Sequence, residues 1–234
     1  MAFGPIMRFK AGELQLELAP LTKEDMSEFV SVSHGGGMQR LSVSRYLGIS
    51  SAPTAEDEAD WYEKTRTATD TLVWGIWVVD EKAGEITRTL IGNSALIEID
   101  KGGHTKLIRQ AVSGSMIFRP EYWGKGIASA AHKARTWYAF KQLGLHRVKS
   151  AVIQANVGSR TALERSGYSL VYIERNEQFS DGQIHHLDNL ECLNPYDFFW
   201  KQWWHGDRPT KTATDARRRT LEALNWAENN VEIT

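Results

Sequence analysis

Hydrophobic and polar residues alternate along residues 13–19, ELQLELA, with the two-residue period of a half-buried β-strand. Thr22 and Asp25 follow at the spacing of a capping box and precede an apolar face, so the chain is predicted to pass from this strand into a helix. A second helix is expected over residues 51–69, where Thr54 precedes a run of acidic residues.

The period of the pattern changes after residue 70. Residues 71–80, 87–100 and 106–118 are rich in β-branched and aromatic side chains, and the turn-forming sequences EKAGE and KGGH separate them. We therefore expect three consecutive strands that form an antiparallel meander.

A longer helix and a β-α-β unit are predicted next. Residues 124–143 place small and aromatic side chains at three- and four-residue steps, and Gly144 is the residue type that commonly ends a helix. A strand is expected over 146–154, followed by a short helix over 156–167 with Asn156 at its N-cap.

Residues 168–174 and 183–193 have the composition of a closing strand pair. Because the strand before the long helix and the strand after it form a β-α-β unit, the sheet is expected to be mixed. The predicted fold class is α/β (α+β), with a mostly antiparallel sheet of six to seven strands flanked by helices.

Composition limits the classes of partner. The 234 residues are 41% hydrophobic and carry a formal net charge of −1, which gives no electrostatic basis for binding nucleic acid. The longest apolar stretch, Leu72 to Val79, is far shorter than the roughly 20 residues of a membrane-spanning helix, and the first ten residues lack a signal-peptide pattern. The single cysteine, Cys192, excludes an intrachain disulfide and a multi-cysteine zinc site. We expect a cytoplasmic protein without a bound metal or a membrane partner.

Two regions are expected along the chain: a domain over residues 1–195 and an aromatic-rich helical extension over 196–234. The extension has three alternative uses, which are to cap the domain, to line an acceptor pocket or to bury a homodimer contact. Its aromatic cluster consists of Phe198, Phe199, Trp200, Trp203 and Trp204.

Gly124, Lys125 and Gly126 lie between the last strand of the meander and the long helix. A helix N-terminus presents free N–H groups, and glycines remove the Cβ atoms that keep an anion away, so this loop is a candidate phosphate cradle. An ordinary glycine turn is the alternative interpretation. A Walker P-loop is excluded because Gly126 follows the lysine, and a dinucleotide fingerprint is weak because Ser129 occupies the third glycine position.

The motifs after this loop are more specific than the loop itself. YWGKGIA at 122–128 is followed by LGLHRV, then by NVGS at 156–159 and RSGY at 165–168. In this order and spacing they resemble the GNAT N-acetyltransferase superfamily, and within it the branch of ribosomal-protein alanine N-acetyltransferases. The resemblance extends over residues 13–193.

The resemblance implies that acetyl-CoA is the co-substrate, with its pyrophosphate at the glycine loop and its pantetheine arm between the two strands of the β-α-β unit. It further implies that backbone N–H groups of the loop contact phosphate, that the strand before the loop pairs with the amides of the arm, and that Asn156 hydrogen-bonds the arm. A plain N-cap is the alternative role for Asn156. The implied cofactor-binding residues are Ile117, Phe118, Trp123, Gly124, Lys125, Gly126, Ile127, Ala128, Asn156 and Ser159.

The reaction implied by the resemblance is direct attack of a primary amine on the thioester in a ternary complex. Many members protonate the leaving thiolate with a tyrosine at the position where this sequence has Leu163, so the hydroxyl of Ser159 is the candidate general acid. The branch often carries an acidic residue in the strand before the loop, whereas this sequence has Ser113 and Ser115 there. The candidate bases are Glu98 and Glu177, with Asp100, His104, His185 and His186 as further alternatives.

The acceptor is expected to be a protein N-terminal α-amine or a small amine. Deprotonating a lysine amine at pH 7 costs about 4.6 kcal/mol, whereas an α-amine costs only about 1 kcal/mol, so a site without a strong base suits the α-amine. The acceptor groove is expected between residues 31–50 and 176–186. The alternative function is a non-catalytic acyl-CoA-binding or regulatory module that lacks the base.

Overall fold

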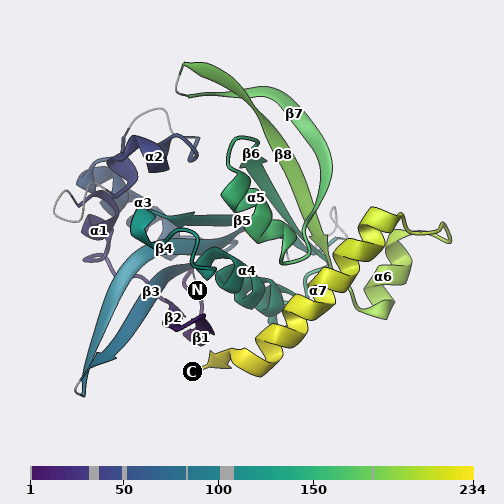
Figure 1. The fold of residues 1–234 in the computed structure, drawn as a ribbon, viewed down its shortest axis with the longest axis horizontal. Coiled ribbons are helices and arrows are strands. Elements are labelled where there is room, and N and C mark those ends of the chain that lie inside the picture. The colour runs from purple at the N-terminus through teal and green to yellow at the C-terminus, as the bar shows by residue number, and fades with distance from the viewer. Residues whose placement is uncertain (1, 32–36, 49–51, 83, 101–107, 181) are drawn as a thin grey trace.

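A computed structural model of the chain describes residues 2–31, 37–48, 52–82, 84–100, 108–180 and 182–234. The described residues form one mixed sheet of nine strands in the order β7-β8-β6-β5-β4-β3-β2-β1-β9, with helices on both faces (Figure 1). The α/β class and the mostly antiparallel sheet are confirmed. The expected number of six to seven strands is too low, because two short strands at one edge, β1 and β9, lie in segments whose patterns did not predict extended chain.

The antiparallel meander is confirmed as β3, β4 and β5, which pair in sequence order. The closing pair is also present, with β8 between β7 and β6. The strands are β1 (Met7–Ala11), β2 (Leu14–Ala19), β3 (Leu72–Lys82), β4 (Glu85–Asp100), β5 (Gln110–Ile117), β6 (Arg147–Ile153), β7 (Ser169–Ser180), β8 (Gln183–Leu193) and β9 (Glu232–Ile233).

The longer helices form where capping residues and apolar periods predict them, whereas the short helix α2 was not predicted. Thr54 begins the second predicted helix, since its hydroxyl accepts a hydrogen bond from the Asp57 N–H at 3.1 Å and the Asp57 carboxylate accepts one from the Thr54 N–H at 2.8 Å. The helices are α1 (Met26–Val30), α2 (Leu41–Ser44), α3 (Ala55–Thr67), α4 (Ile127–Trp137), α5 (Val157–Glu164), α6 (Asp197–Trp203) and α7 (Lys211–Asn230), with shorter turns η2 (Gly37–Gln39), η3 (Pro120–Tyr122) and the π-helical η4 (Tyr138–Gln142).

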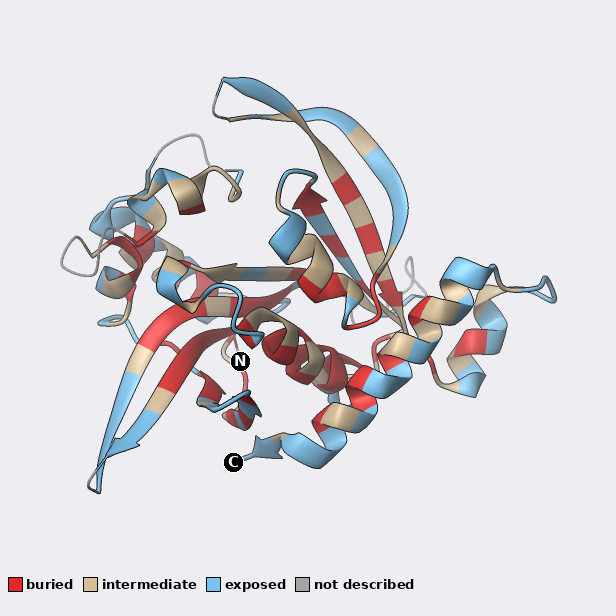
Figure 2. Cartoon of the chain, viewed as in Figure 1, coloured by how far each residue is buried: buried red, intermediate tan, exposed pale blue. Residues whose placement is uncertain are grey.

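Two apolar clusters cover the two faces of the sheet. On one face, α4 packs against the sheet and α7 packs on α4, β7 and β8, and the buried residues include Ala131, Ala134 and Leu224. On the other face, α1 and its neighbours cover a second cluster that contains Phe29 and Phe118. Figure 2 shows α4 as buried and intermediate residues with none exposed, whereas the far ends of the β3–β4 and β7–β8 hairpins are exposed. The central strands of the sheet are therefore packed against apolar residues on both faces.

The sheet opens between β5 and β6. These strands pair in parallel only from Gln110–Arg147 to Val112–Lys149, whereas β6 pairs with β8 along its whole length. The edge of β5 from Ser113 to Ile117 has no partner strand on the β6 side. Helix α4 connects the two strands, so the helix N-terminus lies at the wide end of this opening.

The C-terminal segment is part of the same fold. Helix α7 packs on α4, and Leu224 and Ala227 are buried in the cluster beneath it. The chain then returns to the sheet, where β9 pairs with β1. The extension expected over residues 196–234 therefore packs on α4 and adds a strand to the sheet of the first region. Within the described residues, no helix is both long and apolar enough to cross a membrane.

Candidate functional site

A cavity of about 870 Å³ lies where β5 and β6 separate. Its walls come from the end of β5, the glycine loop, the first turns of α4, the end of β6 and the start of α5. The region around α2 and one residue of β7, Gln178, line it from the other side. Residues from both segments predicted for the acceptor groove therefore reach this cavity. Residues 32–36, 49 and 50 of the first segment and Asp181 of the second lie outside the described residues.

The glycine loop leaves the N-terminus of α4 open. Gly124 and Gly126 have φ values of +75° and +79°, and a Cβ added at either position meets no atom within 4 Å. Gly126 is the N-cap of α4, and no side chain caps this end. The first N–H groups of the helix, before that of Ala130, have no intrahelical acceptor, so they and the helix dipole favour an anion at this point.

The loop is attached to β5 by an aromatic side chain. The Trp123 indole donates a hydrogen bond from Nε1 to the Ile117 carbonyl at 2.8 Å. The Lys125 ammonium lies 5.2 Å from the centre of the Tyr122 ring. Of the predicted loop residues, Trp123, Gly124, Gly126, Ile127 and Ala128 line the cavity, and Lys125 does not.

The two predicted strand residues differ in orientation. The Phe118 N–H donates to the Ile91 carbonyl at 2.9 Å, and the Phe118 ring packs 4.9 Å from that of Phe29 in the core. The Phe118 N–H is therefore bonded to β4, so the predicted backbone contact of this residue with the arm is left to its carbonyl group. Since backbone groups alternate along a strand, the Ile117 N–H points away from β4 and toward the opening.

Asn156 caps α5 at the edge of the cavity. Its Oδ1 accepts a hydrogen bond from the Ser159 N–H at 3.1 Å, and no described group bonds its Nδ2. Asn156 and Ser159 both line the cavity. Helix α5 is held beside β8 by Asp188, a buried carboxylate that accepts hydrogen bonds from Arg160 and from Gln154. Leu163 is buried in the core and has no functional group to offer.

The predicted bases do not meet in the cavity. Glu98 is exposed at an irregularity in β4 with a φ of +52°, opposite the beginning of β5 rather than its open end. Glu177 is exposed next to Gln178 and does not line the cavity. Among the described residues that line the cavity there is no carboxylate. The alternatives Asp100, His185 and His186 also lie off its walls, and His104 lies outside the described residues.

Sequence patterns did not single out His132, which lines the cavity from α4. Its side chain is 3% exposed, and its Nδ1 lies 2.7 Å from Nη2 of the fully buried Arg135. Burial, together with the Arg135 charge, lowers the pKa of His132 well below 6.5. The available signal was the pair of large polar residues at i and i+3 on the alanine-rich face of a helix.

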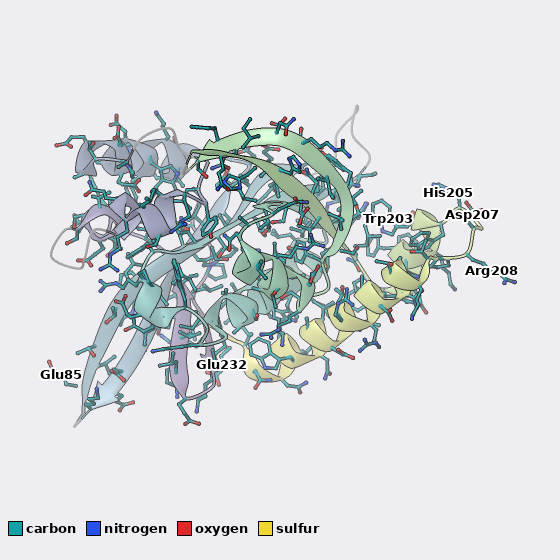
Figure 3. All side chains as sticks on the ribbon, turned by 45° about the horizontal axis from the view of Figure 1, so that its top comes forward. Glu85, Trp203, His205, Asp207, Arg208 and Glu232 are labelled. Carbon is teal, nitrogen blue, oxygen red and sulfur yellow. The ribbon has the colours of Figure 1, made fainter. Side chains whose placement is uncertain are left out.

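The aromatic cluster of the extension lies elsewhere. None of its five residues lines the cavity. Instead, Phe199 packs 4.8 Å from the His146 ring, and Arg217 lies 4.9 Å from the centre of the Trp200 ring. In Figure 3, Trp203 is at the α6–α7 end of the molecule, far from the tip of the β3–β4 hairpin marked by Glu85. A role for this cluster in lining the described acceptor cavity is therefore wrong.

Known proteins resemble this chain in sequence and in fold. The chain is 32% identical over 108 residues to the Bacillus subtilis (strain 168) protein named "Probable N-acetyltransferase YjcK", and the match spans 46% of this chain and 57% of that relative. A spermidine N-acetyltransferase from Vibrio cholerae, solved with CoA and spermine, superimposes with a TM-score of 0.61 at 21% identity over 78% of this chain and 96% of its own. Mycobacterium smegmatis RimJ, solved with CoA-disulfide, gives a TM-score of 0.62 at 17% identity over 99% and 96% of the two chains.

The solved structures show similarity of fold at these identities. The model of the acetyltransferase (GNAT) domain matches residues 15–169, which include the meander, the glycine loop, α4, β6 and α5. The chain therefore belongs to the GNAT acetyltransferase family.

Proposed function

We propose that this protein is an N-acetyltransferase that transfers the acetyl group of acetyl-CoA to a primary amine by direct attack in a ternary complex. The observation that carries the proposal is the continuity between the uncapped N-terminus of α4 and the cavity between β5 and β6. CoA consists of an anionic nucleotide head and a long uncharged arm. The open N-terminus of α4 suits the head, and the cavity suits the arm.

The residues present fit the cofactor. An added Cβ at Gly124 or Gly126 would project into open space in front of the helix, where phosphate oxygens need to approach the N–H groups. The Ile117 N–H and the Asn156 Nδ2 face the cavity as free donors for the amides of the arm. Bound acetyl-CoA supplies the reactive thioester.

The protein's contribution to the reaction is to position the two reactants and to exclude water. The amine nitrogen forms the new N–C bond with its lone pair, the C–S bond breaks, and the sulfur leaves with that electron pair as a thiolate. The ammonium proton formed on the nitrogen is lost to solvent or to the thiolate. Ser159 is the hydroxyl of the predicted set that lines the cavity, and we assign to it the donation of a hydrogen bond to the leaving sulfur.

The electrostatics of the cavity favour a single amine rather than a polyamine. The described lining residues include no carboxylate, so a polycation would enter without a charge partner. A protein N-terminal α-amine is neutral in a useful fraction at pH 7, because its pKa is close to 7.8, and it therefore reacts without a strong protein base. We therefore infer that the acceptor is an α-amine.

The test measures release of free thiol from acetyl-CoA in the presence of short peptides with free N-termini, spermidine or an aminoglycoside. The matched control is the same peptide with its N-terminus already acetylated. We expect thiol release with the free peptide and none with the blocked one. Binding of CoA without turnover on any acceptor would instead indicate an acyl-CoA-binding module, and absence of CoA binding would overturn both functions.

A further inference from the structure

Helix α4 carries two polar side chains on the face that packs against the opening of the sheet. His132 lines the cavity and is 3% exposed, and Arg135 lies one turn later and is fully buried. The Arg135 guanidinium donates to the Ser94 hydroxyl at 2.9 Å and to the Gly114 carbonyl at 2.7 Å. It also donates to the Ser113 hydroxyl at 2.5 Å. Helix α4 is thus attached to β4 and β5 through neutral oxygen atoms.

The bond between these two side chains fixes the tautomer of His132. A guanidinium has only donors, so the His132 Nδ1, 2.7 Å from Arg135 Nη2, must be the acceptor. A neutral imidazole that accepts at Nδ1 carries its proton on Nε2. No described group of the protein bonds this Nε2. It is therefore the ring nitrogen that remains available to a ligand.

His132 is not suited to act as a base. Burial and the adjacent Arg135 cation both favour the neutral ring, and they lower the pKa of His132 well below 6.5. Within the described residues, Arg135 has no carboxylate partner to neutralise its charge. A cation that donates to Nδ1 draws electron density from the ring and makes the Nε2–H a stronger donor.

The position of His132 along α4 indicates which part of a ligand it meets. It lies five residues beyond Ile127, which is about 7.5 Å along the helix axis from the open N-terminus. The next turn of α4 is bonded to Gly114, in the stretch of β5 that has no partner strand on the β6 side. If a ligand binds with its phosphates at the N-terminus of α4, the part of the ligand that contacts His132 is the arm that extends from the phosphates into the cavity.

We propose that His132 presents a neutral Nε2–H, polarised by Arg135, as a hydrogen-bond donor to the acyl-pantetheine arm of the bound co-substrate. The inference rests on the proposed function, because it takes acyl-CoA as the occupant of the cavity. It assigns to the α4 face a contact that the loop and strand residues do not provide. In this role His132 holds the arm against α4 and stabilises negative charge that develops on an acceptor atom of the arm.

The binding experiment compares two probes by calorimetry: CoA, and adenosine 3′,5′-bisphosphate, which carries nucleotide phosphates but no arm. In His132→Leu, we expect CoA affinity to fall by roughly 3- to 10-fold, while bisphosphate affinity stays at the wild-type value. His132→Gln, which keeps both an acceptor and a donor, is expected to restore most of the CoA affinity. Thr136→Val is the matched control, since Thr136 is buried on the same helix and does not line the cavity; it should leave both affinities unchanged.

The outcomes separate this inference from the proposed function. If wild-type protein binds no CoA, the proposed function fails. If it binds CoA but His132→Leu binds CoA equally well, or weakens both probes alike, or if His132→Gln is as impaired as His132→Leu, the inference on His132 is overturned and the function stands. A second measurement, the ¹⁵N spectrum of histidine-labelled protein, should show the Nε2–H tautomer and a change at Nε2 with CoA but not with the bisphosphate. An Nδ1–H tautomer would also overturn the inference.

Discussion

Replacing Gly126 with alanine separates a structural role of the glycine loop from a binding role. Gly126 is the N-cap of α4 with φ +79°, and an added Cβ would meet no protein atom within 4 Å. A steric clash inside the protein therefore contributes nothing to the effect. What remains is the backbone strain of a left-handed residue and the methyl group that would stand in front of the open N–H groups.

The two contributions have different magnitudes and different readouts. Left-handed backbone at alanine costs about 1–2 kcal/mol of folding free energy. Blocking one charge-assisted hydrogen bond from the helix N-terminus to a phosphate costs about 1.5–3 kcal/mol of binding free energy, which corresponds to roughly a 10- to 150-fold increase in the Kd for CoA.

Gly84 supplies the matched control. It has φ +84° in the β3–β4 hairpin, an added Cβ there also meets nothing within 4 Å, and it does not line the cavity. We expect urea denaturation to show a similar loss of stability in Gly126→Ala and Gly84→Ala, and calorimetry to show weaker CoA binding only in Gly126→Ala. Equal CoA affinity in the two variants would refute the placement of the pyrophosphate at this loop.

Three further predictions concern stability and binding elsewhere. Asn156→Ala and Thr210→Ala each remove a side-chain N-cap and should each cost about 1 kcal/mol of unfolding free energy, but only Asn156→Ala should weaken CoA binding in calorimetry; equal CoA affinities would contradict a ligand contact by Asn156. Leu224→Ala should cost about 2–5 kcal/mol in urea denaturation while the exposed Leu221→Ala costs little, and similar losses would contradict a shared core beneath α7. Burial, with a smaller contribution from a neighbouring carboxylate, raises the pKa of Glu58 to about 7, so the native state resists its ionisation and loses stability as the pH rises from about 4.5 to 7. Glu58→Gln should therefore be more stable than wild type at pH 8, by at most about 3 kcal/mol, and equal to it at pH 4, as measured by denaturation at both pH values.

The elements that sequence predicts best are those whose signals are local. The capping pair Thr54 and Asp57, the meander of β-branched strands and Gly144 at the end of the α4 segment are each found in the structure. The first predicted helix begins later than expected, at Met26, because the Asp25 carboxylate accepts from the Thr22 N–H without a reciprocal cap. The short β9 was not predicted, since two residues carry no period and depend on β1 for pairing.

The glycine loop and the Asn156 cap also belong to these local signals, because φ preferences and N-cap hydrogen bonds involve residues close in sequence. The positions of the carboxylate candidates, by contrast, do not depend on local signals. Glu98 and Glu177 lie in strands whose register and bulges decide which side each residue faces, and both are exposed away from the cavity.

By itself, the sequence determined the class of fold, the order of most of its elements, the family and the glycine loop before α4, where we propose that the cofactor's phosphates bind. Only the tertiary structure decided that β5 and β6 separate after a short ladder, that the Phe118 N–H is bonded to Ile91, and that His132 reaches the cavity with Arg135 behind it. The physical reason is the range of the interactions. Capping, turns and periodicity act within a few residues, whereas the cavity and the tautomer of its histidine depend on contacts between α4 and strands far away in the chain.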